Sequence, residues 1–219
     1  MQFVVEIYDP ATECIAAEVL IEGERVQEIP GVLGWTEFDA NATHHLDEKD
    51  ILRINQHFGQ KIDPKATLVR LRHKVFLDEL PYQLHTNREL ALMLKDEKPL
   101  SVFAGAHPPC SEVEEIPERL FDRYVSVGRF VKAEYIEPVQ PSAAQMIRRV
   151  FYALPGEVWR IRAYSLLLAT AKTSGWSEGF ERMEGSLLGY TDEQNDAYIS
   201  LMRARSVHAQ GANIELPVL

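Results

Sequence analysis

The sequence predicts an α+β protein in which an N-terminal domain of mixed strands and helices precedes a small all-helical C-terminal bundle. Three observations support this division. Apolar and polar side chains alternate between Thr67 and Phe76, as in a strand with one buried face. From residue 142 onward the apolar side chains recur at helical spacing. Pro138 and Pro141 separate the two patterns, because proline interrupts regular hydrogen bonding.

These patterns predict three segments. An acidic α+β domain is expected over residues 1–140, a helical bundle over 141–205 and a C-terminal tail over 206–219. The tail is expected because the residues after Arg205 continue no helical stripe.

In the first segment, strands are expected where apolar runs are bounded by Gly, Pro or Asp, at residues 3–8, 15–21, 25–29, 67–76, 99–104 and 129–137. The second and third of these runs flank Gly23 and predict a hairpin. Helices are expected where a capping residue or an N-terminal proline precedes an apolar stripe, at residues 47–58, 86–94 and 117–127.

Four short helices are expected after the prolines. Ser142 and Thr191 each begin a capping box, Pro155 starts the second helix, and Ser177 caps the third. Met146, Ile147, Val150 and Phe151 give the first of these helices one apolar face. Residues 163–171 are apolar nearly all round, so we expect that helix to lie in the middle of its neighbours.

Charge is distributed unevenly along the 219 residues. Residues 1–141 hold 15 Lys and Arg against 25 Asp and Glu, whereas residues 142–219 hold eight of each, so the net charge of −10 belongs to the first part. A pI near 5.2 argues against general nucleic-acid binding and against binding to an anionic membrane surface, because both depend on clustered Lys and Arg. It permits a basic protein partner.

The sequence favours a cytoplasmic location. Its two cysteines, Cys14 and Cys110, are fewer than a disulfide-stapled secreted domain would carry, so both are expected as reduced thiols. The N-terminus lacks the basic start and apolar core of a signal peptide. The most apolar segment, residues 163–171, is shorter than the ~20 residues that span a bilayer.

The first candidate site is a metal centre at His44, His45 and Asp47, because zinc and iron sites often combine two imidazoles with a carboxylate. Neighbouring residues of an extended segment point to opposite faces, so two adjacent histidines on one ion would require a turn. The alternative is a polar loop that leads into a helix capped by Asp47.

The second candidate site is a nucleophilic thiol at Cys110 with His107 nearby, since an imidazole can lower the pKa of a thiol. The prolines between the two residues hold the segment extended, and no family signature surrounds the cysteine. The alternative is a loop thiol without a function.

The third candidate site is an anion-binding strip. Arg70, Arg72 and Lys74 project from one face of the strand at 67–76, at intervals of ~6.6 Å. His85 and Arg88 lie at the start of the next helix, where free amide groups favour a carboxylate or phosphate. These groups converge if the helix folds back onto the strand. The alternative is that the strip pairs with acidic side chains across the sheet.

Common catalytic motifs are missing from the sequence, including the Walker loop, G-x-G-x-x-G, G-x-S-x-G, H-E-x-x-H and paired C-x-x-C. We therefore expect a cytosolic accessory or regulatory protein that binds a protein or peptide partner through its acidic domain and the basic strip, with the helical bundle supplying rigidity or an oligomer contact. No cofactor is favoured. The alternative is a small-molecule hydrolase or transferase that uses a metal at His44, His45 and Asp47 or the thiol of Cys110.

Overall fold

The computed structural model describes residues 2–35, 39, 42–109, 116–138 and 145–211, with backbone alone for residues 207–211. The chain divides into two compact units. Unit 1 comprises residues 1–79 and 83–88, and unit 2 comprises residues 80–82 and 89–219. Both contain an antiparallel sheet with helices, so the fold class is α+β.

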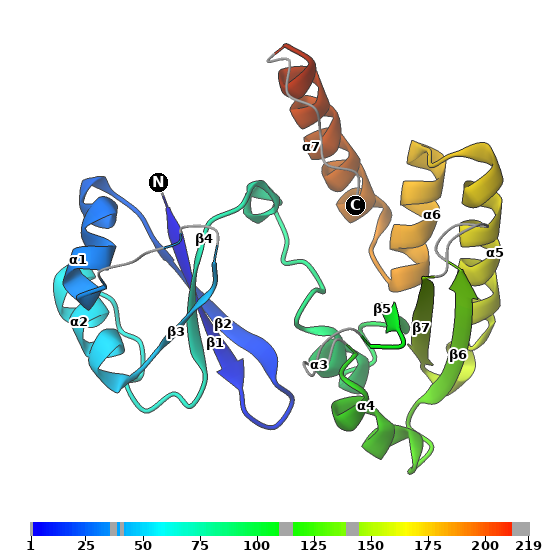
Figure 1. The fold of residues 1–219 in the computed structure, drawn as a ribbon, viewed down its shortest axis with the longest axis horizontal. Coiled ribbons are helices and arrows are strands. Elements are labelled where there is room, and N and C mark those ends of the chain that lie inside the picture. The colour runs from blue at the N-terminus through cyan, green and yellow to red at the C-terminus, as the bar shows by residue number, and fades with distance from the viewer. Residues whose placement is uncertain (1, 36–38, 40–41, 110–115, 139–144, 212–219) are drawn as a thin grey trace. The chain divides into compact units, whose positions relative to one another are not determined.

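Unit 1 is built on a four-stranded sheet in the order β2-β1-β4-β3. Its strands are β1 (Phe3–Asp9), β2 (Cys14–Ile21), β3 (His44–Leu46) and β4 (Val69–His73). The helices α1 (Ile29–Leu33) and α2 (Glu48–Phe58) lie on one side of this sheet (Figure 1), and two short 3₁₀ helices, η1 (Glu24–Glu28) and η2 (Phe76–Glu79), complete the unit.

The core of unit 1 lies between the sheet and these helices. Strand residues at alternate positions meet helix residues at helical spacing, so each element contributes one apolar face. The buried core residues are Phe3, Val5, Ile21, Val26, Ile29, Leu33, Leu46, Ile51, Ile54, Ile62, Val69 and Leu71. The opposite face of the sheet is therefore the one that carries the polar side chains of β1, β2 and β4.

The expected hairpin around Gly23 is wrong. Residues 15–21 pair with β1, and Arg25 to Ile29 form the helical segment that runs from η1 into α1. Val26 and Ile29 are both buried and lie three residues apart, which is the spacing of one helix face and not of a strand.

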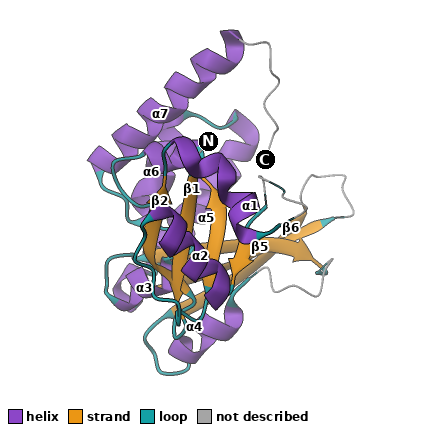
Figure 2. Cartoon of the chain, turned by 90° about the vertical axis from the view of Figure 1, so that its left-hand side faces the viewer, coloured by secondary structure: helices purple, strands orange, loops and turns teal. Residues whose placement is uncertain are grey.

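Unit 2 is built on a three-stranded sheet in the order β5-β7-β6. Its strands are β5 (Leu100–His107), β6 (Val131–Pro138) and β7 (Met146–Ala153). The helices are α3 (Glu89–Leu94), α4 (Glu118–Val125), α5 (Trp159–Ser174), α6 (Glu178–Leu188) and α7 (Asp192–Gly211), with the 3₁₀ helix η3 (Pro155–Glu157) before α5. Figure 2 distinguishes these helices from the strands by colour.

Helices cover both faces of this sheet. On one face, Phe151 of β7 packs against Tyr164 of α5, and Leu187 of α6 belongs to the same cluster. On the other face, the Tyr152 ring lies 4.6 Å from that of Phe121 on α4. Residues 150–153 of β7 are consequently all buried.

The helix expected to begin at Ser142 and to include Met146–Phe151 is wrong, because that segment is strand β7. A central strand buried on both faces is a continuous apolar run, and periodicity alone does not separate such a run from a buried helix. Residues 139–144, where the capping box was expected, lie outside the described residues.

The two units do not coincide with the expected domains. The expected boundary at residues 140–141 falls between β6 and β7, which pair along their whole length from Val131↔Ala153 to Pro138↔Met146. The units separate instead near residues 79–89. Unit 1 carries 15 acidic and nine basic residues, a net −6, and unit 2 carries 18 and 14, a net −4, so both units are acidic.

The expected tail is also shorter than predicted, since α7 continues past Arg205 to Gly211. Among the described residues, no helix combines the length and the apolar character needed to cross a bilayer.

The strand pairing predicts how fragments behave. A fragment of residues 142–219 retains β7 without either neighbouring strand, so we expect it to lack stable tertiary structure. A fragment of residues 89–219 retains all three strands, and we expect it to give dispersed amide resonances and a cooperative thermal transition. Cooperative unfolding of the shorter fragment would contradict the division into units.

Candidate functional site

The residues of the expected anion-binding strip lie on the face of the unit 1 sheet opposite the core. Val69 and Leu71 of β4 are buried in the core, so Arg70 and Arg72 project from the other face, as the alternation predicts. The neighbouring strands bring acidic residues to this face: Glu6 of β1 lies opposite Arg70, and Glu18 of β2 lies opposite Glu6.

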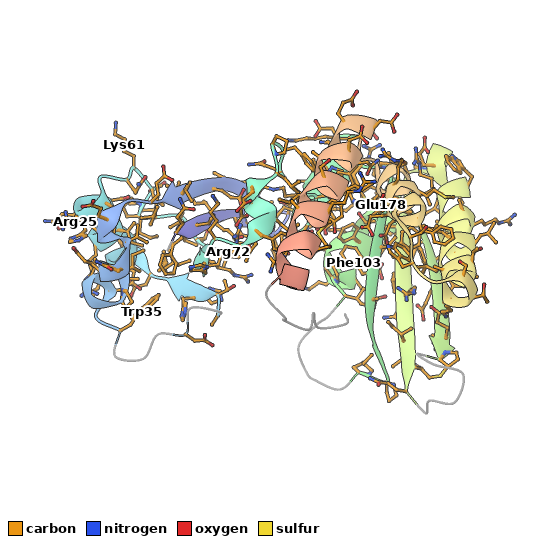
Figure 3. All side chains as sticks on the ribbon, turned by 90° about the horizontal axis from the view of Figure 1, so that it is seen from above. Arg25, Trp35, Lys61, Arg72, Phe103 and Glu178 are labelled. Carbon is orange, nitrogen blue, oxygen red and sulfur yellow. The ribbon has the colours of Figure 1, made fainter. Side chains whose placement is uncertain are left out.

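Arg72 (labelled in Figure 3) is bound by three carboxylates of its own unit. Its Nε donates to Glu6 at 2.5 Å, and its two terminal nitrogens donate to the two Asp78 oxygens at 2.6 and 2.8 Å. A terminal nitrogen also lies 3.2 Å from Glu18. Only 19% of the Arg72 side chain is exposed, so the bidentate pair with Asp78 is largely withdrawn from water.

The pKa values at this pair follow from the same contacts. Burial alone would raise the pKa of the Asp78 carboxyl, but hydrogen bonds from Arg72 and from the Val75 amide hold it below its usual range. Burial disfavours the charged guanidinium of Arg72, yet the hydrogen bonds to Asp78 and Glu6 raise its pKa. Both groups therefore stay ionised in neutral solution.

Arg88 joins the same group of residues. It donates to Glu18 at 2.7 Å and to the Ile15 carbonyl at 2.8 Å, so Arg72 and Arg88 meet on one carboxylate. We call Glu6, Glu18, Arg72, Asp78 and Arg88 the charged network.

Arg70 and Tyr8 border the charged network. The Arg70 guanidinium lies over the Tyr8 ring, 4.8 Å from its centre, and the Tyr8 hydroxyl donates to Glu6 at 2.8 Å. Burial, followed by the hydrogen bond to Glu6, raises the pKa of Tyr8 to about 12, so the phenol remains a neutral donor.

The structure thus brings Arg72 and Arg88 together, but their guanidinium groups donate hydrogen bonds to acidic side chains of the same chain. This arrangement corresponds to the alternative of pairing across the sheet. Lys74 follows β4 directly, and His85 contributes its carbonyl to the Arg88 amide. The helix expected from Thr86 begins at Glu89 and has only six residues. A role of these residues in binding an external anion stays a prediction.

The histidines of the expected metal centre have other contacts. His44 lies beside Trp35, with ring centres 4.6 Å apart, and its Nε2 is 2.8 Å from the Asp39 carbonyl oxygen. His45 lies opposite Arg70 in the sheet. Asp47 caps α2, accepting from the Asp50 amide at 2.8 Å, which is the predicted alternative. Within the described part of the chain, no group of three or more His, Cys, Asp or Glu residues could hold a metal ion.

His107 is the last residue of β5 and pairs with Met146 of β7. Cys110 lies outside the described residues, so the expected thiol site has one described member.

A second group of ion pairs joins α4 to β6 and β7 in unit 2. Glu118 accepts from Arg148 at 2.5 and 2.9 Å and from Lys132 at 2.6 Å. The hydrogen bond from Arg148 is the main reason that the pKa of Glu118 falls from 4.5 to about 2, against the opposing effect of burial. Because Arg148 lies on β7, these contacts attach α4 to the central strand.

Helix α5 carries a surface that the sequence analysis missed. Ile161, Tyr164 and Leu167 are buried against the unit, whereas Trp159 is 56% exposed and Leu166 is 69% exposed. The expectation that this apolar helix lies in the middle of its neighbours is therefore wrong. No signal in the sequence indicated this exposed face, because a helix that is apolar nearly all round is usually buried on every side.

The exposed residues of α5 form one line along the helix. Trp159, Arg162, Leu166, Ala169 and Thr173 are all exposed and are spaced alternately by three and four residues, so they share one helix face. We call these five residues the α5 strip.

The charge of α5 is unlike that of the whole chain. Its 16 residues include Arg160, Arg162 and Lys172 but neither Asp nor Glu. Arg160 donates to Glu157 at 2.6 Å, and Lys172 pairs with Glu137. Arg162 makes no ion pair or hydrogen bond with any residue that the structure describes. The α5 strip therefore joins an unneutralised cation to exposed apolar side chains.

The chain matches no protein-family model, no curated protein sequence and no solved structure.

The charged network predicts that Arg72 stabilises unit 1. Replacing Arg72 with Ala leaves the carboxylates of Glu6 and Asp78 with no guanidinium between them, so we expect the free energy of unfolding to fall by about 3–5 kcal/mol. Lys61→Ala, an exposed position in the same unit that makes none of these contacts, is the control and should cost below about 1 kcal/mol. Chemical denaturation measures both. Equal, small effects would show that Arg72 is not structurally engaged.

Glu118 predicts acid sensitivity. Its pKa is depressed in the folded protein, so its stabilisation is present above about pH 4.5 and is lost as the pH falls toward 2. Glu118→Gln should therefore flatten the dependence of unfolding free energy on pH in that window, whereas Glu97→Gln, an exposed control in unit 2, should leave the slope unchanged. Chemical denaturation at a series of pH values measures the unfolding free energy of each variant. The same dependence on pH in the wild type and in Glu118→Gln would contradict the prediction.

Proposed function

We propose that the protein acts by binding a protein partner, and that the α5 strip makes the contact. The exposure of Trp159 and Leu166 on one helix face carries this proposal. Apolar side chains gathered on a surface favour burial against another molecule, at roughly 25 cal/mol per Å² removed from water. Trp and Arg are also the residue types that most often dominate the binding energy of protein interfaces.

Trp159 is held ready for such a contact. The Arg160 guanidinium lies over its ring, 4.8 Å from the centre, and is itself fixed by Glu157 and by the Ser186 carbonyl at 2.8 Å. A side chain that is ordered before binding loses less conformational entropy when the partner arrives, which increases affinity.

This proposal moves the contact away from the strip at Arg70, Arg72, Lys74, His85 and Arg88. Arg72 and Arg88 direct their donors to Glu6, Glu18 and Asp78, so fewer of their nitrogens remain for a partner. In the proposed role, the charged network keeps unit 1 rigid.

The alternative of a hydrolase or transferase has less support. His44 and Asp47 are engaged in a loop contact and a helix cap, and the contacts described for His107 are those of a strand end.

A matched pair of leucines tests the proposed contact. Leu166→Asp places a charge in the α5 strip, whereas Leu52→Asp places one on α2 of unit 1, at a leucine that is also exposed, to 49%. We expect a stoichiometric partner to copurify with the wild-type protein and the Leu52 variant from its own cells, and to be lost with Leu166→Asp. Affinity purification with quantitative mass spectrometry makes the comparison.

Thermal unfolding of both variants provides the folding control, since substitution of an exposed side chain is expected to change stability by about 0.5 kcal/mol or less. Identical sets of copurifying proteins from two folded variants would remove the α5 strip from consideration.

A further inference from the structure

We propose that the α5 strip binds an amphipathic helix that carries carboxylate side chains, and that Arg162 selects that charge. The inference rests on the proposed function, because it names the occupant of the same surface. Three features of the strip support it: its spacing, its unneutralised cation and the small side chains at its C-terminal end.

The spacing of the strip fits a helix. Trp159, Leu166 and Thr173 recur every seven residues, with Arg162 and Ala169 between them, which is the a/d pattern of a helix–helix seam. The strip is ~21 Å long from Trp159 to Thr173, at 1.5 Å per helical residue. A second helix of similar length can lie along it and place one side chain per turn between these residues.

The size of the side chains gives the seam a direction. Trp159, Arg162 and Leu166 are large, whereas Ala169 and Thr173 are small, so a partner helix can approach the C-terminal half of α5 more closely. The large residues then provide apolar and polar contacts in the N-terminal half. We expect the partner to place small residues against Trp159 and larger apolar residues against Ala169.

The charge of the strip selects an acidic occupant. Covering the strip removes Arg162 from water, and a guanidinium without a carboxylate pays a desolvation cost that an ion pair offsets. The other two cations of α5 are already paired, with Glu157 and Glu137. A carboxylate of the partner, one turn from its apolar contacts, supplies the missing anion and can bind the guanidinium through two hydrogen bonds.

The same reasoning disfavours a second copy of α5 as the occupant. An antiparallel pairing centred on Leu166 would set each Arg162 against Ala169 of the other copy, with no acidic residue on either helix. Two guanidinium groups would then lose water without gaining an anion. The experiment therefore also measures whether the protein associates with itself through the strip.

Two synthetic helical peptides provide the probe. Both are about 21 residues long, three heptads, with Leu and Ala at the seam positions, and they differ only in carrying Glu or Lys beside the seam. Each is labelled with fluorescein and titrated with the full-length protein at low salt, and fluorescence polarisation measures the affinity. We expect the Glu peptide to bind at least about tenfold more tightly than the Lys peptide.

Three variants assign the preference. Arg162→Gln should reduce the Glu-over-Lys ratio at least about fivefold, and Arg205→Gln, an exposed arginine on α7, should leave it unchanged. Leu166→Asp should abolish binding of both peptides, which ties the signal to the strip. Sedimentation of the protein alone at the same concentrations measures self-association.

The outcomes separate this inference from the proposed function. If the two peptides bind equally, or if Arg162→Gln leaves the ratio unchanged, while Leu166→Asp abolishes binding, the surface stands and the acidic occupant is wrong. Self-association that Leu166→Asp abolishes would replace that occupant with a second copy. Absence of binding by either peptide, together with a monomeric protein, would overturn both the inference and the surface.

Discussion

Carboxylates offset the desolvation cost of the largely buried Arg72 and of Arg148, and these ion pairs hold together elements in both units. Arg72 is paired within the chain, with Glu6, Glu18 and Asp78 around its three nitrogens. Arg148 is paired with Glu118 and Glu134. Each of these arginines connects segments that are distant in sequence, so the ion pairs fix how strands and helices meet. Arg162, by contrast, is exposed and lacks such partners in the described residues. Arg72 and Arg148 are therefore structural, whereas Arg162 is available to bind a ligand.

Local signals in the sequence predicted local structure well. The caps at Asp47 and Ser177 and the capping box at Thr191 are present, because a side chain that satisfies a free amide acts within three residues. The alternation at β4 is present because a strand at the middle of a sheet with one apolar core face repeats every second residue. Arg72 and Arg88 both bind Glu18, whereas the sequence predicted that they meet on an external anion, which stays a prediction. Glu6 and Glu18 were not identified as their partners, since these residues belong to strands whose pairing the sequence left open.

The errors arose where tertiary contacts decide between local alternatives. Met146–Ala153 carries an apolar pattern compatible with a helix, and only the neighbours β5 and β6 make it a strand. That mistake displaced the domain boundary, because Pro138, expected to end a domain, is the last residue of β6 and pairs with Met146 of β7. The contrast in net charge was also measured across that expected boundary. Counted by unit, the net charge is −6 in unit 1 and −4 in unit 2, so the contrast is weaker.

The relevant electrostatic contrast is therefore local. In a chain of net charge −10, α5 is a 16-residue segment with three cations and no anion, and acidic residues from outside the helix neutralise two of them. Water and salt screen the whole-protein charge over a distance of ~10 Å, so a distant acidic surface cannot substitute for a carboxylate at Arg162. Covering the exposed Trp159 and Leu166 would lower the local dielectric around Arg162, which strengthens its attraction to an acid at the same moment. The apolar contacts of the strip thus strengthen the ion pair at Arg162. This gain is open only to an occupant that brings both apolar side chains and a carboxylate.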